Sequence, residues 1–180
     1  MKKTSTILVI ALALFPFSNS VTESATASIY SSNEQVKSSH DDKKSKVVTV
    51  FGKGGETLSV SKASSLEKGD RITITGTNFD SNIGIYVLEC VLVPVGNLPT
   101  PCFAEFSAAW ISSNPPPYGV GLAIPYLAGG SFVLTRNVAS NSVLSNINCK
   151  VITCAIYVRA DHTRGEDRSY DLAVPLQFEN

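Results

Sequence analysis

The sequence predicts an all-β domain, a sandwich of about seven strands. Apolar and polar side chains alternate in several short runs, turn residues recur at short intervals, and no stretch keeps a helical period. The chain also carries four cysteines, an even number, which fits a fold tied by disulfide bonds. Together these three observations favour a small β fold with covalent cross-links.

The N-terminus is typical of a secretory signal peptide. Lys2 and Lys3 precede an apolar run over residues 7–15, and small polar residues follow it. This run is shorter than the roughly 20 apolar residues that span a bilayer. We expect a signal peptide over residues 1–27, cleaved after Ser20 or Ala27, and a mature chain without a membrane span that is secreted or held at the cell surface.

Residues 28–46 are rich in Ser, Lys, Asp, Asn and Gln, and we interpret them as a disordered linker. The whole chain has 15 basic and 15 acidic side chains, and the net charge stays near zero without residues 1–27. Nucleic-acid-binding proteins usually carry a basic excess, so a nucleic-acid partner is not expected. One domain, expected to be a monomer, then occupies residues 47–180.

Short alternating runs within this domain predict its strands, with turns at residues 66–70 and 80–84. Residues 103–110 are ambiguous, and the prolines at 115–117 keep the next stretch extended. Along residues 155–161, alternation directs Ile156 and Val158 into the sandwich and the other side chains to the opposite face. The expected strands lie around residues 58–60, 71–76, 85–90, 131–138, 155–161 and 171–178.

An exported chain folds in an oxidising compartment, so we expect the four cysteines to form two disulfides. Three connectivities are possible. Joining neighbours, Cys90 to Cys102 and Cys149 to Cys154, is the simplest within a β fold. Loops of about 13 and about 6 residues would then contribute about 2.9 and about 2.2 kcal/mol in the chain-entropy treatment.

Several features of the domain also occur together in one known family. They are the run at 69–76, Tyr86 ahead of Cys90, the short loop to Cys102, Phe106 beyond it, and the spacing of Cys149 and Cys154. In these features the domain resembles the neocarzinostatin-type immunoglobulin-like proteins of actinobacteria. Runs at 110–116, 129–132 and 159–169 further resemble a set of secreted actinobacterial proteins of this fold. The resemblance implies a seven-stranded immunoglobulin-like sandwich with these two disulfides.

Chromoprotein members of that family hold an enediyne in a cleft beside the sheet, and several matching positions differ here. Leu92 stands where they have tryptophan, Ala155 replaces a glutamine, Tyr157 a glycine and Arg159 a serine. Residues 139–148 also lack the aromatic side chains of the matching loop. We expect a narrower, more polar cleft that suits a smaller anionic or aromatic group, held by charge-assisted hydrogen bonds from Arg159. The candidate ligand-binding residues are Phe106, Trp110, Ala155, Tyr157, Arg159 and Asp161.

The polar residues also allow two other functions, a hydrolase site and a calcium site. His162 with Ser140 or Ser169 and a carboxylate would suit a hydrolase, but no nucleophile motif accompanies them. Carboxylates could bind calcium, and the same carboxylates could instead pair with arginines and order the loop after residue 160. The residues concerned are Asp161, Glu166 and Asp167 for calcium, and Arg159, Arg164 and Arg168 with Asp161, Asp167 and Asp171 for ion pairs. We expect no catalytic residues, no metal and no cofactor.

Trp110, Tyr118 and Tyr126 lie in or next to the proline-rich segment, and they either cover one end of the sandwich or form a recognition surface. The function predicted from the sequence is a secreted, non-catalytic binding module for a small ligand or a surface partner. The alternative is a structural or adhesive protein of the cell surface. A third interpretation, from the resemblance, is an antibiotic chromophore carrier with DNA-targeting activity.

Overall fold

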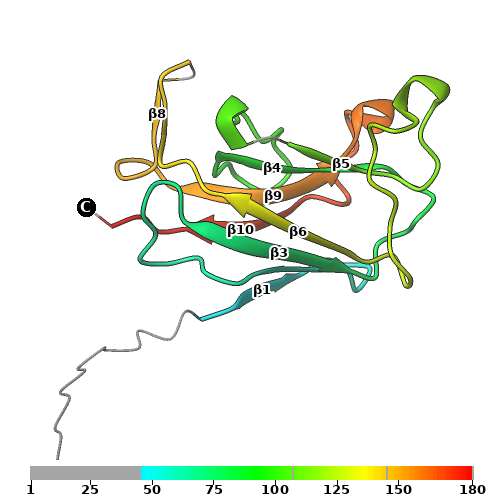
Figure 1. Ribbon diagram of the computed structural model, residues 1–180, viewed down its shortest axis with the longest axis horizontal. Helices are drawn as coiled ribbons and strands as arrows, with labels where there is room; N and C mark the ends of the chain where they lie inside the picture. Colours follow the sequence, from blue (N-terminus) through cyan, green and yellow to red (C-terminus); the bar gives the residue numbers. More distant parts are fainter. Residues whose placement is uncertain (1–45, 107, 145, 180) are drawn as a thin grey trace, which may run out of the picture. The chain divides into compact units, whose positions relative to one another are not determined.

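The computed structural model describes residues 46–106, 108–144 and 146–179. The predicted signal peptide and all but the last residue of the predicted linker lie outside these residues. The described part is all-β, with two four-stranded antiparallel sheets in the strand orders β1-β2-β3-β6 and β10-β9-β4-β5. Figure 1 shows these sheets as two layers, with β3 and β6 in one and β4, β5 and β9 in the other.

The strand bounds follow the alternating runs of the sequence. In the first sheet the strands are β1 (Val48–Phe51), β2 (Thr57–Val60), β3 (Arg71–Thr77) and β6 (Phe132–Asn137). In the second they are β4 (Ile85–Val91), β5 (Ala109–Ile111), β9 (Cys154–Ala160) and β10 (Leu172–Leu176). A two-stranded ribbon, β7 (Asn141–Ser142) and β8 (Ile147–Asn148), projects from the sandwich (Figure 1). Short 3-10 turns lie at η1 (Ala104–Phe106), η2 (Pro117–Gly119) and η3 (His162–Arg164).

The core lies between the two sheets and is filled by the inward half of each alternating strand. Ile72 and Ile74 of β3 face it from one sheet, and Ile156 and Val158 of β9 face it from the other, all fully buried. Burying such a side chain contributes about 1.5–3 kcal/mol. None of the described segments forms a helix long and apolar enough to cross a membrane.

The structure confirms the predicted fold class. Seven of the eight sandwich strands in the described residues, β2 to β6 with β9 and β10, make up the expected seven-stranded sandwich. The ambiguous segment contains η1 and the first two residues of β5. The eighth strand, β1, pairs antiparallel with β2, with Val50 opposite Leu58. It was not among the predicted strands, since its four residues adjoin the polar linker.

Both expected disulfides are present. Cys90 is bonded to Cys102 and Cys149 to Cys154. The first closes the loop that follows β4, and the backbone N–H of Val91 donates to the Pro101 carbonyl across its base (3.0 Å). The second joins Cys149, directly after β8, to Cys154, the first residue of β9. Both bridges therefore attach loops to the second sheet.

Candidate functional site

The outer face of the second sheet contains most of the sequence-predicted site. Alternation along β9 places Ile156 and Val158 in the main core, whereas Ala155 and Tyr157 pack in a separate cluster on the other side of the sheet. Across the sheet Tyr157 is opposite Leu88 and Ala173, and Arg159 is opposite Tyr86. This outer face has two differently built ends, one around Tyr157 and the other beyond Arg159.

At the Tyr157 end the phenol ring is 4% exposed and packs against Leu92 and Val93 of the disulfide-closed loop. The backbone N–H of Val93 donates to the Tyr157 hydroxyl oxygen (3.0 Å), which attaches this loop to the sheet. Burial raises the pKa of the Tyr157 hydroxyl, so the phenol stays protonated at neutral pH. Tyr157 therefore fills the space between this loop and β9, and the narrowed cleft expected from the sequence stays a prediction.

A pocket of about 310 Å³ remains open beside Tyr157. Its walls are the end of β1, the loop at residues 92–97, and residues 171–173 at the start of β10. Val50, Phe51, Leu92, Val93 and Ala173 give it a largely apolar lining. The pocket thus lies between the loop closed by Cys90 and Cys102 and the strand that precedes the seven-stranded core. We call it the apolar pocket because apolar side chains dominate its lining.

Asp171 is the charged residue in the lining of the apolar pocket. One carboxylate oxygen, Oδ2, accepts from the Arg168 guanidinium (3.1 Å), and the other, Oδ1, is buried with no hydrogen-bond partner among the described residues. Burial raises the pKa of the Asp171 carboxyl, although the nearby Arg168 and Arg159 charges oppose this effect. Asp171 is therefore a poorly solvated carboxylate at the edge of the pocket.

Arg159 lies between the two ends of the face. Its guanidinium carbon is 5.8 Å from the centre of the Tyr86 ring, a cation–π arrangement. Its Nε is buried and has no hydrogen-bond partner among the described residues. Arg159 is not in the described lining of the apolar pocket, whose charged group is instead the acid Asp171.

Beyond Arg159 the face is closed by hydrogen bonds centred on Asp161, which is 2% exposed. Asp161 Oδ2 accepts from the Trp110 indole N–H (2.8 Å), and Oδ1 accepts from the Thr163 backbone N–H (2.9 Å) and hydroxyl (2.5 Å). Burial alone would raise the pKa of this carboxyl, but the three hydrogen bonds outweigh it and the pKa is lowered. Gly84 is required beside it, since any side chain there would collide with the Asp161 carboxylate.

His162 completes this closed end. The Tyr86 hydroxyl shares a hydrogen bond with Nδ1 of His162 (2.5 Å), and the Tyr118 hydroxyl shares one with Nε2 (2.7 Å). The Trp110 ring meets the imidazole edge-on, with centroids 5.0 Å apart, and stacks on Tyr118 at 6.5 Å. We call Tyr86, Trp110, Tyr118, Asp161 and His162 the aromatic cluster. It joins β4, β5, η2 and η3, and thereby holds the proline-rich segment on the sheet.

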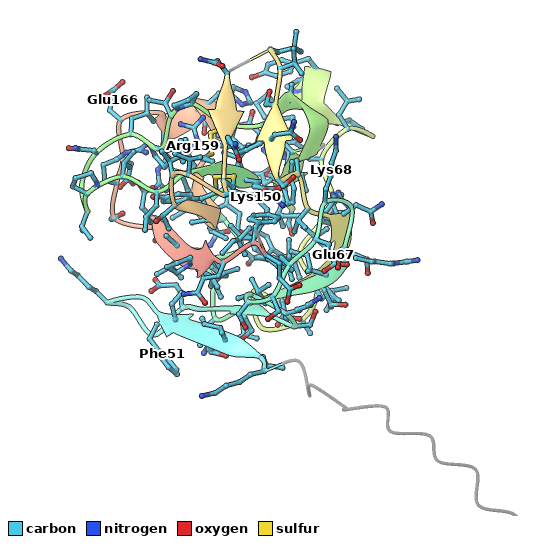
Figure 2. All side chains as sticks on the ribbon, turned by 90° about the vertical axis from the view of Figure 1, so that its left-hand side faces the viewer. Phe51, Glu67, Lys68, Lys150, Arg159 and Glu166 are labelled. Carbon is cyan, nitrogen blue, oxygen red and sulfur yellow. A yellow bond between two sulfur atoms is a disulfide. The ribbon has the colours of Figure 1, made fainter. Side chains whose placement is uncertain are left out.

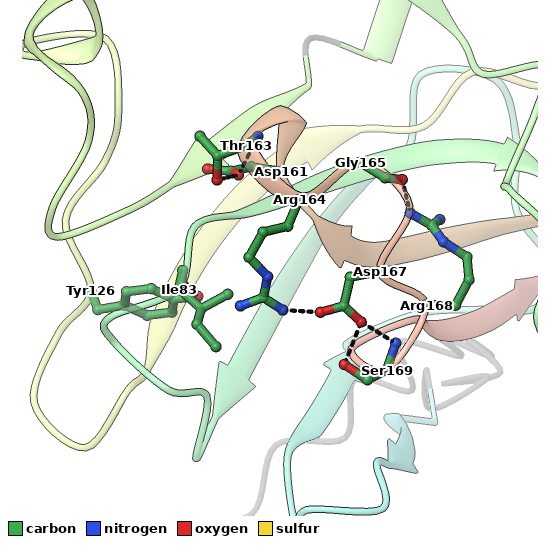
Figure 3. A network of polar contacts seen from close by, with 9 residues as sticks. All are labelled: Ile83, Tyr126, Asp161, Thr163, Arg164, Gly165, Asp167, Arg168 and Ser169. Carbon is green, nitrogen blue, oxygen red and sulfur yellow. Dashed lines mark hydrogen bonds and ion pairs between the residues drawn. The ribbon is translucent and has the colours of Figure 1, made fainter.

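The charged loop between β9 and β10 is ordered by its own ion pairs, as the sequence predicts (Figure 3). Arg164 pairs with Asp167, and Arg168 pairs with Asp171 and also donates to the Gly165 carbonyl. Ser169 donates to Asp167 through its backbone N–H (2.8 Å) and its hydroxyl (2.6 Å), and these bonds with Arg164 lower the Asp167 pKa to about 2. The prediction is confirmed for Arg164 and Arg168; Arg159 instead lies over Tyr86.

The hydrolase and calcium alternatives involve the same residues. Both ring nitrogens of His162 are bonded to tyrosine hydroxyls, and Ser169 donates to Asp167 rather than to His162. The oxygens of Asp161 and Asp167 accept protein donors, and the described residues contain no group of three or more metal-ligating side chains. These side chains therefore take part in the structure of the loop and the aromatic cluster.

Of the six predicted site residues, Tyr157 is in the described lining of the apolar pocket, and the other five are not. Phe106 is 1% exposed and packs in the main core between the sheets, so it does not flank a ligand on the outer face. Ala155 is fully buried beneath the loop, and Trp110 belongs to the aromatic cluster, away from the apolar pocket. Tyr126 is half-buried and donates to the Ile83 carbonyl (3.1 Å), so it covers one end of the sandwich (Figure 3).

The pocket walls include residues that the sequence did not single out. Val50 and Phe51 come from the unpredicted strand β1, and Asp171 was expected only as an ion-pair partner. The signal for β1 was the alternation of Val48, Thr49, Val50 and Phe51 ahead of a glycine-rich turn.

The two-layer fold, the two disulfides and the pocket beside one sheet define a disulfide-linked immunoglobulin-like sandwich. The family model described as the Neocarzinostatin family matches residues 58–174, and the chain belongs to this family. Among solved structures, macromomycin is 19% identical with a TM-score of 0.47, over 69% of this chain and 100% of its own. Apokedarcidin is 19% identical with a TM-score of 0.43, over 69% of this chain and 98% of its own. No curated protein sequence matches the chain. Strand β1 precedes the matched residues.

Proposed function

We propose that this protein is an exported, non-catalytic binding module that holds a small, largely apolar molecule in the apolar pocket beside Tyr157. The observation that carries the proposal is the pocket itself, about 310 Å³ in volume, with aliphatic and aromatic walls. Small-molecule sites are usually clefts of about 300–1,000 Å³ lined mainly by apolar side chains with a few polar groups. The pocket lies at the small end of this range, which favours a compact ligand over a bulky polycyclic chromophore.

The polarity of the walls refines the ligand expected from the sequence. The charged group that lines the pocket is Asp171, while the Arg159 guanidinium lies over Tyr86. An ionised carboxylate repels an anionic ligand, and the repulsion between two like charges is stronger in the low-dielectric surroundings of a pocket than in water. The proposed ligand is therefore a neutral aromatic or aliphatic molecule, which replaces the anionic group expected from Arg159.

A non-catalytic role is supported by the way the polar side chains are used. His162, the histidine of the described residues, is bonded at both nitrogens within the aromatic cluster. General-base catalysis needs a histidine within hydrogen-bond reach of the group it deprotonates. Here its neighbours are Tyr86 and Tyr118, whose hydroxyl groups attach the proline-rich segment to the sheet. Export is supported by the two disulfides and by the predicted signal peptide.

The proposal can be tested with N-phenyl-naphthylamine, a neutral aromatic probe whose fluorescence rises in apolar surroundings. We expect saturable binding to the natural protein and loss of binding in Ala173→Phe, because the new ring fills the pocket from β10. Ala128→Phe places the same ring at an exposed site outside the pocket and should bind like the natural protein. Ala173→Leu offers a milder block if the larger ring impairs folding. Equal binding by all variants would refute the proposal.

A cell-surface adhesive role has its own supporting observation. Val143 and Leu144, between β7 and β8, are 88% and 82% exposed. Exposed apolar side chains at the end of a projecting ribbon suit contact with another surface. Cell fractionation separates the two functions: release into the medium supports a soluble binding module, whereas retention at the cell surface supports adhesion.

A further inference from the structure

A second pocket adjoins the apolar one along the edge formed by β1 and β10. Its volume is about 520 Å³, and its walls are the turn after β1 and residues 168–172. The two pockets share Phe51, Val95, Asp171 and Leu172 in their linings. Phe51 is 76% exposed on β1 (Figure 2), and Val95 of the disulfide-closed loop is fully exposed. The two pockets therefore adjoin as one groove, and Phe51 and Val95 line both halves.

The second pocket differs from the first in polarity, and we call it the polar pocket. Its lining includes Lys53, Glu56, Arg168 and Asp171, two cations and two anions, together with Ser169. The formal charges cancel, so the pocket carries no net charge to attract a cationic or an anionic group. Hydrogen-bonding capacity without net charge matches a neutral, hydroxyl-rich or amide group.

The rim of the polar pocket is a tight, internally bonded turn. The Gly52 N–H donates to the Glu56 carbonyl (2.7 Å), and the Gly54 N–H donates to the Glu56 carboxylate (2.9 Å). Side chains at Gly52 or Gly54 would collide with that carboxylate, and Gly55 has a φ of 93°. The turn is thus shaped in advance, which lowers the entropic cost of binding. It lies in the residues that precede the family match, which begins at residue 58.

We propose that this groove binds an elongated neutral amphiphile, with its apolar part in the apolar pocket and its uncharged polar head in the polar pocket. The inference rests on the proposed function, because it takes the apolar pocket as the ligand site. Residues 48–56, outside the family match, supply one wall of both halves and set the preference for an amphiphile. Phe51 contacts the ligand where its apolar part meets its head.

The test measures the displacement of bound N-phenyl-naphthylamine by four molecules that share an eight-carbon chain, each kept below its micelle concentration or, for octanol, below its solubility limit. Octyl glucoside has a neutral head, octyl sulfate an anionic one and octyltrimethylammonium a cationic one, while octanol carries a single hydroxyl. We expect octyl glucoside to bind at least about tenfold more tightly than octanol, and Phe51→Ala to weaken octyl glucoside more than octanol. Lys53→Glu should shift the preference towards the cationic head, whereas Lys150→Glu, the same charge change at another pocket, should not.

The outcomes separate the two proposals. The proposed function holds if N-phenyl-naphthylamine binds the natural protein and Ala173→Phe blocks this binding. The amphiphile inference is nevertheless wrong if octyl glucoside and octanol then compete equally and Lys53→Glu has the same head-group preference as Lys150→Glu. In that case the ligand ends at the apolar pocket. Failure of the naphthylamine itself to bind would overturn the proposed function as well.

Discussion

The two ends of the outer face of β9 contain similar side chains, but one end is closed by hydrogen bonds and the other has an open pocket. Around Asp161, a buried carboxylate receives three hydrogen bonds and two tyrosine hydroxyls bond one imidazole, so the aromatic cluster is closed. Around Asp171, a half-buried carboxylate has one buried oxygen with no hydrogen-bond partner among the described residues, and it adjoins an open pocket. The presence of tyrosine, aspartate and other aromatic side chains is therefore not enough to identify a ligand site. A ligand site also requires that these side chains are not already fully hydrogen-bonded within the protein.

The largest effects are expected from the disulfide that closes the wall of the open end. Replacing Cys90 and Cys102 with serine should lower the free energy of unfolding by about 2.9 kcal/mol and abolish probe binding, because residues 92–97 lose their closure. Replacing Cys149 and Cys154 should cost about 2.2 kcal/mol and leave probe binding intact at temperatures where the variant is folded. Urea denaturation and probe fluorescence measure both. Equal loss of binding in the two double variants would contradict the account.

At the closed end, Asp161→Ala should lower the free energy of unfolding by about 1–3 kcal/mol, since the Trp110 indole N–H and the Thr163 N–H lose their acceptor. Probe binding should persist, because the aromatic cluster is separate from the pocket. Asp161→Asn retains an acceptor oxygen, so its free energy of unfolding should fall by less than that of Asp161→Ala. Unchanged urea midpoints in both variants would show that the closed end is not held by Asp161.

Acid titration should give opposite slopes for the two carboxylates. The folded-state pKa of Asp161 is lowered, so its ionised form stabilises the protein above the ordinary value of 3.8, and this contribution is lost as the pH falls through the folded pKa. The folded-state pKa of Asp171 is raised, so its ionised form costs stability at neutral pH, and that cost disappears below 3.8. The loss of unfolding free energy in Asp161→Asn, measured against the natural protein, should therefore be smaller at about pH 3 than at about pH 7. For Asp171→Asn the order is reversed: its unfolding free energy relative to the natural protein should be lower at about pH 3 than at about pH 7. Parallel urea midpoints across this range would contradict the assignment.

The smallest effect is expected from Tyr118→Phe, which removes an exposed hydrogen bond to His162. Its cost should be about 0.5–1.5 kcal/mol at most, because water competes for exposed partners. Limited proteolysis of the proline-rich segment offers a more sensitive measurement, and faster cleavage is expected. Unaltered cleavage would mean that the segment is held by Trp110 and the backbone bonds alone.

The sequence predicts the fold class, the disulfide pairing and the loop ion pairs because each depends on local spacing. Alternation over residues 155–161 is enough to orient Tyr157 and Arg159. The apolar pocket could not be predicted in the same way, since its walls join residues 50–51, 92–97 and 171–173, which only the tertiary fold brings together. The aromatic cluster was missed for the same reason: His162 is 76 residues from Tyr86 and 44 from Tyr118.

The central claim is that a ligand enters at Tyr157 and not at the aromatic cluster. Amide proton–nitrogen correlation spectra recorded during titration with naphthol, a small neutral aromatic, test this claim most directly. We predict saturable shifts at the backbone amides of Val93, Gly96 and Ala173, with the Trp110 indole and the His162 amide unchanged. Shifts concentrated at Trp110, Tyr118 and His162, with the pocket amides unmoved, would contradict the account.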